Sequence, residues 1–190
     1  MEKIIQDEIK ESIAVKQRVL HELTSQIKKF AEIIINAYKK GGRVIIFGNG
    51  GSAADAQHIV GELVNKLYFD RPMLDALALT VNTSVLTAIA NDSSYDNVFS
   101  RQIESLVNKD DVVVGISTSG NSRNVINGLL KAKEKGVKTV GMTGSTGGRM
   151  KEIVELLINI PSDITPRIQE AHIMIGHIVC GIVEKELFGK

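Results

Sequence analysis

Apolar residues recur every three or four positions through residues 1–40, with charged residues between them. This spacing predicts two amphipathic helices, with a break and a candidate N-cap at Thr24 or Ser25. Gly41 and Gly42 are expected to end the second helix, because glycine readily adopts the backbone conformation that closes a helix. The two apolar stripes consist of Ile4, Ile5, Ile9, Ile13 and Leu20, then Leu23, Ile27, Phe30, Ile34 and Tyr38.

After Gly42 the pattern changes, and short apolar runs alternate with longer stretches of helical spacing. Such runs are typical of strands that are buried on both faces of a parallel sheet. The alternation predicts a single α/β domain over residues 1–190, with helices on both faces of a parallel sheet. The expected strands are residues 43–47, 77–79, 112–116, 138–142 and 156–160. The expected helices are residues 53–67, 84–90, 96–107, 122–135, 149–153 and about 166–187.

The charge balance and the cysteine count limit which partners the protein can bind and which cellular compartment it occupies. Lys and Arg number 23 against 22 Asp and Glu, so the near-neutral chain has no electrostatic reason to bind nucleic acid or an anionic membrane. The single cysteine, Cys180, excludes an intrachain disulfide and a multi-cysteine zinc cluster. No apolar run approaches the roughly 20 residues of a membrane helix, and the N-terminus has no signal-peptide core. We therefore expect a cytoplasmic protein.

The first candidate ligand loop, residues 47–52, reads Phe-Gly-Asn-Gly-Gly-Ser between a predicted strand and a predicted helix. Glycines allow close backbone approach, and the free N–H groups of a helix start favour an anion. The loop is not a nucleotide-binding P-loop, because no Lys-Ser/Thr follows, and Ala53 replaces the third glycine of a dinucleotide fingerprint. A tight turn capped by Ser52 explains the loop equally well.

The second candidate loop, residues 116–122, reads Ile-Ser-Thr-Ser-Gly-Asn-Ser at the start of the next predicted helix. Its hydroxyl and backbone donors carry no fixed charge, which suits a phosphate monoester that must bind and leave. The alternative is a polar turn capped by Asn121 or Ser122, but four hydroxyl residues are more than a cap needs.

Two predicted helices carry further candidate side chains. His58 and Glu62 are four residues apart, about 40° around one helix, so they share a face. Gln169 and His177 are separated by two turns and about 80°, so both can line one groove. His172 lies about 140° from His177 and is better explained as a packed or capping histidine. Taken alone, His58 and Glu62 are explained as a contact on the helix surface. His177 taken alone is explained as a histidine packed in the core.

Together and in this order, these motifs resemble the sugar isomerase (SIS) domain family, and more narrowly the bacterial sedoheptulose 7-phosphate isomerases, or phosphoheptose isomerases. The resemblance covers essentially the whole chain, and the combination is specific although each piece alone is weak. The matching positions are residues 47–55, His58 with Glu62, Asn91 with Asp92, residues 115–122, residues 167–172 and His177.

The resemblance implies a flavodoxin-like parallel sheet flanked by helices. It also implies a homotetramer, with the N-terminal helices of residues 1–40 at its centre and active sites between subunits. The implied reaction converts sedoheptulose 7-phosphate into D-glycero-D-manno-heptose 7-phosphate through an enediol. This is the first step toward ADP- and GDP-heptose for lipopolysaccharide, capsule or S-layer glycans.

The same resemblance implies roles for individual residues. Glu62 matches the general base and His177 the acid. One zinc ion per subunit is implied, with His58, Glu62, Gln169 and His177 as its ligands. The implied substrate contacts are Asn49, Gly50, Gly51, Ser52, Glu62, Asn91, Asp92, Ser117, Thr118, Ser119, Ser122 and Gln169.

The sequence departs from the family pattern at two places. Asn65 and Lys66 stand where many members have Gly-Arg. A contact that the arginine makes in those members is therefore not expected of Lys66, which lacks the planar guanidinium group. Pro166 stands where some members have an acidic residue.

Three other functions stay open. A DnaA-binding relative of the same family has lost the catalytic pair, and the presence of Glu62 and His177 favours an enzyme over it. A sugar-phosphate sensor would add a helix-turn-helix domain, for which residues 1–40 are too few and not basic. An isomerase of another sugar phosphate would carry the same loop and the same base.

Overall fold

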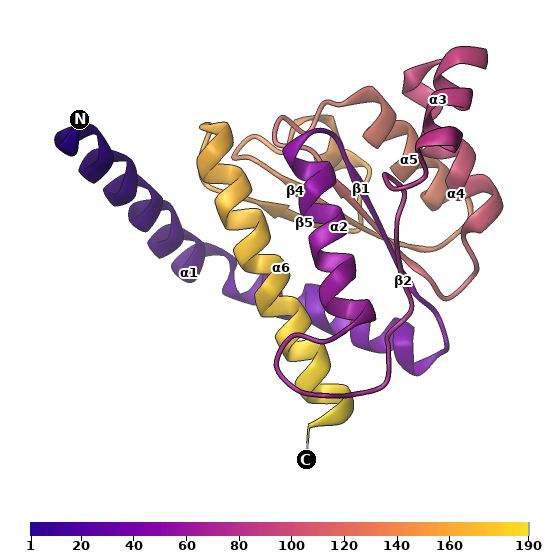
Figure 1. The fold of residues 1–190 in the computed structure, drawn as a ribbon, viewed down its shortest axis with the longest axis horizontal. Coiled ribbons are helices and arrows are strands. Elements are labelled where there is room, and N and C mark those ends of the chain that lie inside the picture. The colour runs from indigo at the N-terminus through magenta and orange to yellow at the C-terminus, as the bar shows by residue number, and fades with distance from the viewer. Residues whose placement is uncertain (190) are drawn as a thin grey trace.

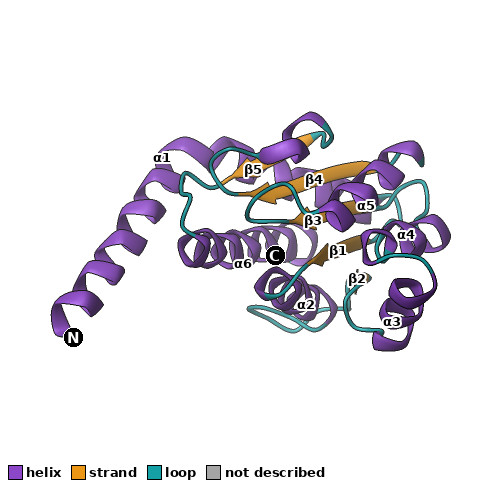
Figure 2. Cartoon of the chain, turned by 90° about the horizontal axis from the view of Figure 1, so that it is seen from above, coloured by secondary structure: helices purple, strands orange, loops and turns teal. Residues whose placement is uncertain are grey.

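The computed structural model describes residues 1–189 and contains one sheet of five strands, all parallel, in the order β2-β1-β3-β4-β5. This is the strand order of flavodoxin-like proteins, so the predicted fold class is confirmed (Figure 2). The strands are β1 (Val44–Gly48), β2 (Ala76–Ala78), β3 (Val112–Ile116), β4 (Lys138–Thr143) and β5 (Leu156–Asn159).

Helices cover both faces of the sheet. Val44 and Ile46 of β1 pack with α1, α2 and α6, whereas Ile45 and Phe47 pack with the side chains of α4 and α5 on the other face. Because β1 and β3 are buried on both faces, their sequences contain no polar side chain. The helices are α1 (Glu2–Lys39), α2 (Gly51–Val64), α3 (Thr83–Asp92), α4 (Ser100–Leu106), α5 (Arg123–Glu134) and α6 (Thr165–Phe188) (Figure 1).

Residues 2–39 form one continuous helix, so the expected break at Thr24 or Ser25 is wrong. The Thr24 hydroxyl donates to the Leu20 carbonyl at 2.6 Å, inside the helix, and caps nothing. The buried positions also continue without interruption from Val15 to Ala37, because one face of the helix packs on α6 and on the sheet. The N-terminal turns project away from the rest of the molecule (Figures 1 and 2).

Two other expected helices differ from the prediction, since one is divided and the other is a 3₁₀ turn. Residues 96–107 divide into a 3₁₀ turn, Tyr95–Asn97, and α4, and residues 149–153 are covered by a 3₁₀ turn, Gly148–Glu152. The Ser94 hydroxyl accepts the Asp96 N–H at 3.1 Å, so a local side-chain bond begins a separate turn there. Within residues 1–189, no helix combines the length and apolar character needed to cross a bilayer.

Candidate active site

The two candidate loops lie side by side at the carboxyl edge of the sheet. The glycine loop follows β1 and the hydroxyl loop follows β3, and these strands are adjacent and parallel. On the other side of β1 lies β2, so connections leave β1 and β3 in opposite directions. In open α/β sheets such a switch point creates the crevice that holds the ligand. The sheet order therefore places both loops where a binding site is expected.

Backbone geometry explains the glycines of the first loop. Gly50 has a φ of 54°, a conformation that glycine adopts without strain, and α2 begins directly after it. A Cβ on Gly48 would stand 2.9 Å from the Ile116 carbonyl oxygen, so only glycine lets the two loops approach this closely. Ser52 is buried in the first turn of α2.

The Asn49 side chain joins the glycine loop to the first turn of α5 and to the 3₁₀ turn of Tyr95. Its amide nitrogen donates to Asn124 Oδ1 at 2.9 Å, and its oxygen accepts from Asn124 Nδ2 at 2.8 Å and from the Tyr95 hydroxyl at 3.1 Å. With these bonds in place, the backbone of Asn49 is better placed than its side chain to contact a ligand. Sequence analysis missed Asn124 and Tyr95, because nothing local marks a partner that lies 75 residues away.

Three hydroxyl groups of the second loop cluster before α5. Ser117 Oγ lies 2.9 Å from Ser122 Oγ and 3.5 Å from Ser119 Oγ, and Ser117 itself is buried. Thr118 and Ser119 also line an open cavity of about 280 Å³ at the ends of β3, β4 and β5. The expected clustering of hydroxyls is present, and their contact with phosphate stays a prediction. Other residues lining this cavity are Asn121, Ser145, Thr146, Asp163 and Thr165.

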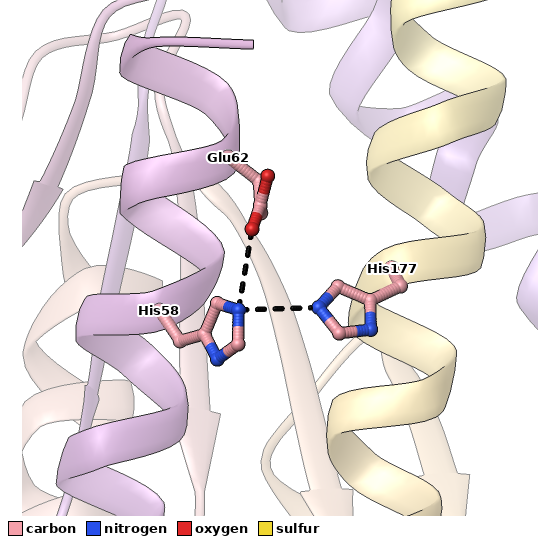
Figure 3. Close-up of side chains that lie close together, drawn as sticks. All are labelled: His58, Glu62 and His177. Carbon is pink, nitrogen blue, oxygen red and sulfur yellow. Dashed lines mark hydrogen bonds and ion pairs between the residues drawn. The ribbon is translucent and has the colours of Figure 1, made fainter. Parts of the chain in front are cut away.

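Glu62, His58 and His177 form a triad between α2 and α6 (Figure 3). His58 Nε2 lies 3.2 Å from Glu62 Oε1 and 3.2 Å from His177 Nε2. The triad is open to solvent in the single chain, since the His58 side chain is 51% exposed and that of Glu62 is 20% exposed. The helical spacing predicted the first contact, and the packing of α6 on α2 supplies the second.

The donor set of the triad fits a divalent metal ion. One atom from each side chain lies within 4.8 Å of the others. Around tetrahedral zinc, with bonds of about 2.0–2.1 Å to nitrogen, neighbouring ligand atoms stand about 3.3 Å apart. The separations of 3.2 Å match this spacing. Two imidazoles and a carboxylate without thiolate suit zinc and related transition metals.

Gln169 lies two turns before His177, with its amide group against Gly51 at the start of α2. Both residues therefore face α2, as their spacing indicates, but Gln169 borders the glycine loop. Asn91 and Asp92 close α3, where Asn91 Nδ2 donates to Asp92 Oδ1 at 2.8 Å. The side-chain bond described for Asn91 and Asp92 is therefore the one between them. Substrate contacts by Gln169, Asn91 and Asp92 stay predictions.

The two departures from the family pattern are explained locally. Lys66 forms an exposed ion pair with Asp70, and Pro166 occupies the first turn of α6, where a missing N–H costs nothing.

Three other titratable groups near α2 and α6 differ in environment. His172 is buried, bonds the Thr143 carbonyl at 3.2 Å, and has its pKa lowered to about 4 by burial, which confirms the prediction of a packed histidine. Burial raises the pKa of the Cys180 thiol to about 12, so it is unreactive. Burial also raises the pKa of the Asp55 carboxyl, against the opposing effect of nearby His58. Sequence analysis did not single out Asp55.

The fold and its two loops define the class of protein. Residues 9–144 match the family model described as the SIS domain. The chain is 54% identical to a phosphoheptose isomerase of Clostridium acetobutylicum, an alignment that covers 100% of this chain and 98% of the relative. A phosphoheptose isomerase of Sulfurimonas denitrificans is 50% identical over the same shares of the two chains. The chain therefore belongs to the SIS domain family and, within it, to the phosphoheptose isomerases.

Solved structures agree with this assignment. The phosphoheptose isomerase of Neisseria gonorrhoeae superposes with a TM-score of 0.92 at 38% identity, covering 97% of this chain and 98% of that chain. The corresponding enzyme of Francisella tularensis gives a TM-score of 0.93 at 31% identity, covering 96% and 97%. The match includes nearly the whole chain, so the long α1 is common to these proteins.

Proposed function

We propose that this enzyme converts sedoheptulose 7-phosphate into D-glycero-D-manno-heptose 7-phosphate, the first step of heptose precursor synthesis for lipopolysaccharide, capsule or related glycans. The observation that carries the proposal is the triad, in which α6 brings His177 to the His58 and Glu62 face of α2. A DnaA-binding relative without catalytic function has no use for this arrangement. Full-length relatives named phosphoheptose isomerase favour a heptose phosphate over another sugar phosphate.

In this reaction a proton moves between C1 and C2 of the sugar. The Glu62 carboxylate removes the proton from one carbon and returns it to the neighbouring carbon, giving an enediol between the two steps. His177 exchanges protons with the two oxygen atoms, because a neutral imidazole both accepts and donates. The hydroxyl loop holds the phosphate at the start of α5, where free N–H groups add to the hydroxyl donors.

His58, Glu62 and His177 would hold one zinc ion, with Gln169, whose amide group lies against Gly51 in this structure, as the fourth ligand. When bound, such an ion would act as a Lewis acid beside the sugar carbonyl. A carboxylate bound to metal is a weaker base, so Glu62 serves either by exchanging between metal and substrate or by moving between two positions.

Self-association completes the proposal. The isoleucines of the N-terminal part of α1 are exposed in the single chain, and an apolar groove of about 300 Å³ lies between α1 and α6. Both surfaces suit packing against further copies of α1, which gives the homotetramer. Sites shared between subunits would then cover the open triad. The exposed isoleucines are Ile4, Ile5, Ile9 and Ile13.

The deciding experiment measures aldose formation from sedoheptulose 7-phosphate by metal-stripped protein, with and without added zinc. Zinc-dependent turnover supports both the reaction and the metal site. Turnover without metal supports the reaction and rejects an essential zinc ion. Absence of turnover in both conditions rejects the proposed substrate.

Glu62→Gln is the matched variant for the same assay. The amide keeps the size of the side chain but takes no proton, so turnover should be lost while the sugar phosphate still binds. Activity within about tenfold of the unchanged protein would reject Glu62 as the base.

A further inference from the structure

A buried ion pair ties the segment after α2 to the last turns of α6. Arg71 Nε lies 3.1 Å from Glu184 Oε1, and the two side chains are 1% and 0% exposed. The Arg71 guanidinium also lies over the Phe188 ring. The bonds of the two ionic residues reach the backbone of Glu62 but no side chain of the triad, and neither residue belongs to the binding loops.

Each member of the pair holds backbone groups near Glu62. Arg71 donates to the Glu62 and Leu63 carbonyl oxygens at 2.8 Å each, in the last turn of α2, where carbonyls have no partner within the helix. The Glu184 carboxylate accepts the N–H groups of Leu67 at 3.0 Å and Tyr68 at 2.8 Å. The turn that carries Glu62 is thus bonded, through Arg71, to a side chain of α6.

The charge state of Glu184 agrees with these contacts. Burial by itself would raise the pKa of the carboxyl, but the hydrogen bonds from Leu67, Tyr68 and Arg71 outweigh it and lower the pKa. Glu184 is therefore ionised at neutral pH and holds its partners with charge-assisted bonds.

The ion pair lies on the same α2–α6 interface as the triad. A Cβ on Gly176 would stand 2.7 Å from Ile59, so the two helices are in close contact beside His58 and His177. Glu184 follows His177 by two turns of α6. It fixes the end of the interface by its bonds to Arg71, Leu67 and Tyr68. Loss of this bond would leave the Glu62 turn free to move against His177.

We infer that Arg71 and Glu184 are positioning residues of the active site, which hold the Glu62 turn of α2 at its working distance from His177. The expected effect on turnover rests on the proposed function. A displacement of about 1 Å in a catalytic group can cost about a hundredfold in rate. A bond between the backbone of Glu62 and the helix that carries His177 controls a displacement of this kind.

A second ion pair, in which the carboxylate is buried and the arginine is partly exposed, offers a matched control. Asp111, 3% exposed, pairs with Arg43 and accepts the N–H groups of Arg43 at 3.0 Å and Asn108 at 2.8 Å. It has the same chemistry as Glu184, with one arginine and two backbone donors. It precedes β3, however, and so lies at the edge of the sheet opposite the site.

The test compares Glu184→Gln and Arg71→Lys with Asp111→Asn, at temperatures well below unfolding. We expect both site variants to lower kcat by about tenfold or more with KM changed by less than about threefold, because sugar-phosphate binding depends on other loops. Asp111→Asn should lower Tm by a similar amount yet keep kcat within about twofold. Arg71→Lys keeps a positive charge, so it provides the test of the inference if Glu184→Gln does not fold.

A crystal structure of the folded site variant provides a readout that does not depend on activity. The 3.2 Å separation of His58 Nε2 and His177 Nε2, or that of His58 and Glu62, should change there and stay constant in Asp111→Asn. Unchanged distances together with unchanged kcat, or an equal loss of kcat in Asp111→Asn, would overturn the inference. If the unchanged protein itself fails to turn over the heptulose phosphate, the proposed function fails and the distances alone decide the positioning role.

Discussion

His58 and Glu62 show how far a local pattern determines a site. Their spacing of four residues on one helix fixes a shared face, and the structure brings them to 3.2 Å. The third member, His177, lies 119 residues from His58, and helical spacing says nothing about that contact. Its place in the site was predicted from the family resemblance and is given physically by the packing of α6 on α2.

The hydroxyl loop leads to a prediction about substrate affinity. Removing the hydroxyls in Ser119→Ala with Ser122→Ala should raise KM by about tenfold or more and lower kcat less, because phosphate is held alike in ground and transition states. Steady-state kinetics with sedoheptulose 7-phosphate measure this. Ser105→Ala on α4, where the hydroxyl bonds the Gln102 carbonyl, is the control. A normal KM in the double variant would remove the loop from the site.

Buried His172 leads to a prediction about stability and pH. Its pKa is about 4 in the folded protein and about 6.5 when unfolded, so the unfolded chain binds the proton more readily. Stability is therefore unaffected above pH 6.5 and falls as the pH drops toward 4, by about 3 kcal/mol from this residue.

Urea unfolding at several pH values measures the effect. His172→Gln should flatten the dependence between pH 6.5 and 4, whatever its effect on absolute stability. His21→Gln, which replaces an exposed histidine of α1, should keep the original slope. An unchanged slope in His172→Gln would contradict the assignment.

At the scale of elements, α1 shows where sequence reasoning fails. Thr24 and Ser25 are good N-cap residues, and a local rule therefore predicts a break there. The hydroxyl of Thr24 is instead satisfied within the helix, and burial of one continuous face decides the outcome. The apolar pattern predicted strand β3 correctly, because a strand that is buried on both faces needs an unbroken apolar run.

The contact between α2 and α6 predicts opposite effects for two glycine substitutions. Gly176→Ala should lower stability by on the order of 1 kcal/mol, and reduce turnover, since its methyl group would stand 2.7 Å from Ile59. Gly61→Ala should raise stability by about 0.5–1 kcal/mol, because no atom within 4 Å opposes a Cβ there and alanine favours a helix. Thermal unfolding and the isomerase assay, applied to both variants, test the pair. A lower stability of Gly61→Ala would contradict the prediction, because it would show that the face of α2 at Gly61 is covered.

At the scale of the whole molecule, the projecting part of α1 indicates an assembly larger than one chain. Ile9 and Ile13 are 55% and 50% exposed in the described chain, and exposed Ile5 lies on the same side of α1. A stripe of this kind suits an interface, because burial of apolar surface is favourable.

Sedimentation measures this directly. The protein should sediment at about four times 20.7 kDa. Ile9→Glu with Ile13→Glu should release smaller species, while Glu11→Lys, a charge change of equal size and opposite sign on the other side of α1, should not. A stable monomer of the unchanged protein would contradict the assembly.

The sequence by itself determined the alternation of strands and helices, the two loops and the shared face of His58 and Glu62. These features depend on periodicity and backbone chemistry, which act over a few residues. Tertiary structure alone decided the bonds from Asn49 to Asn124 and from Arg71 to Glu184, each of which joins residues more than 70 positions apart. No periodic pattern in the sequence indicates such bonds, because only the packing of the helices on the sheet brings their partners together.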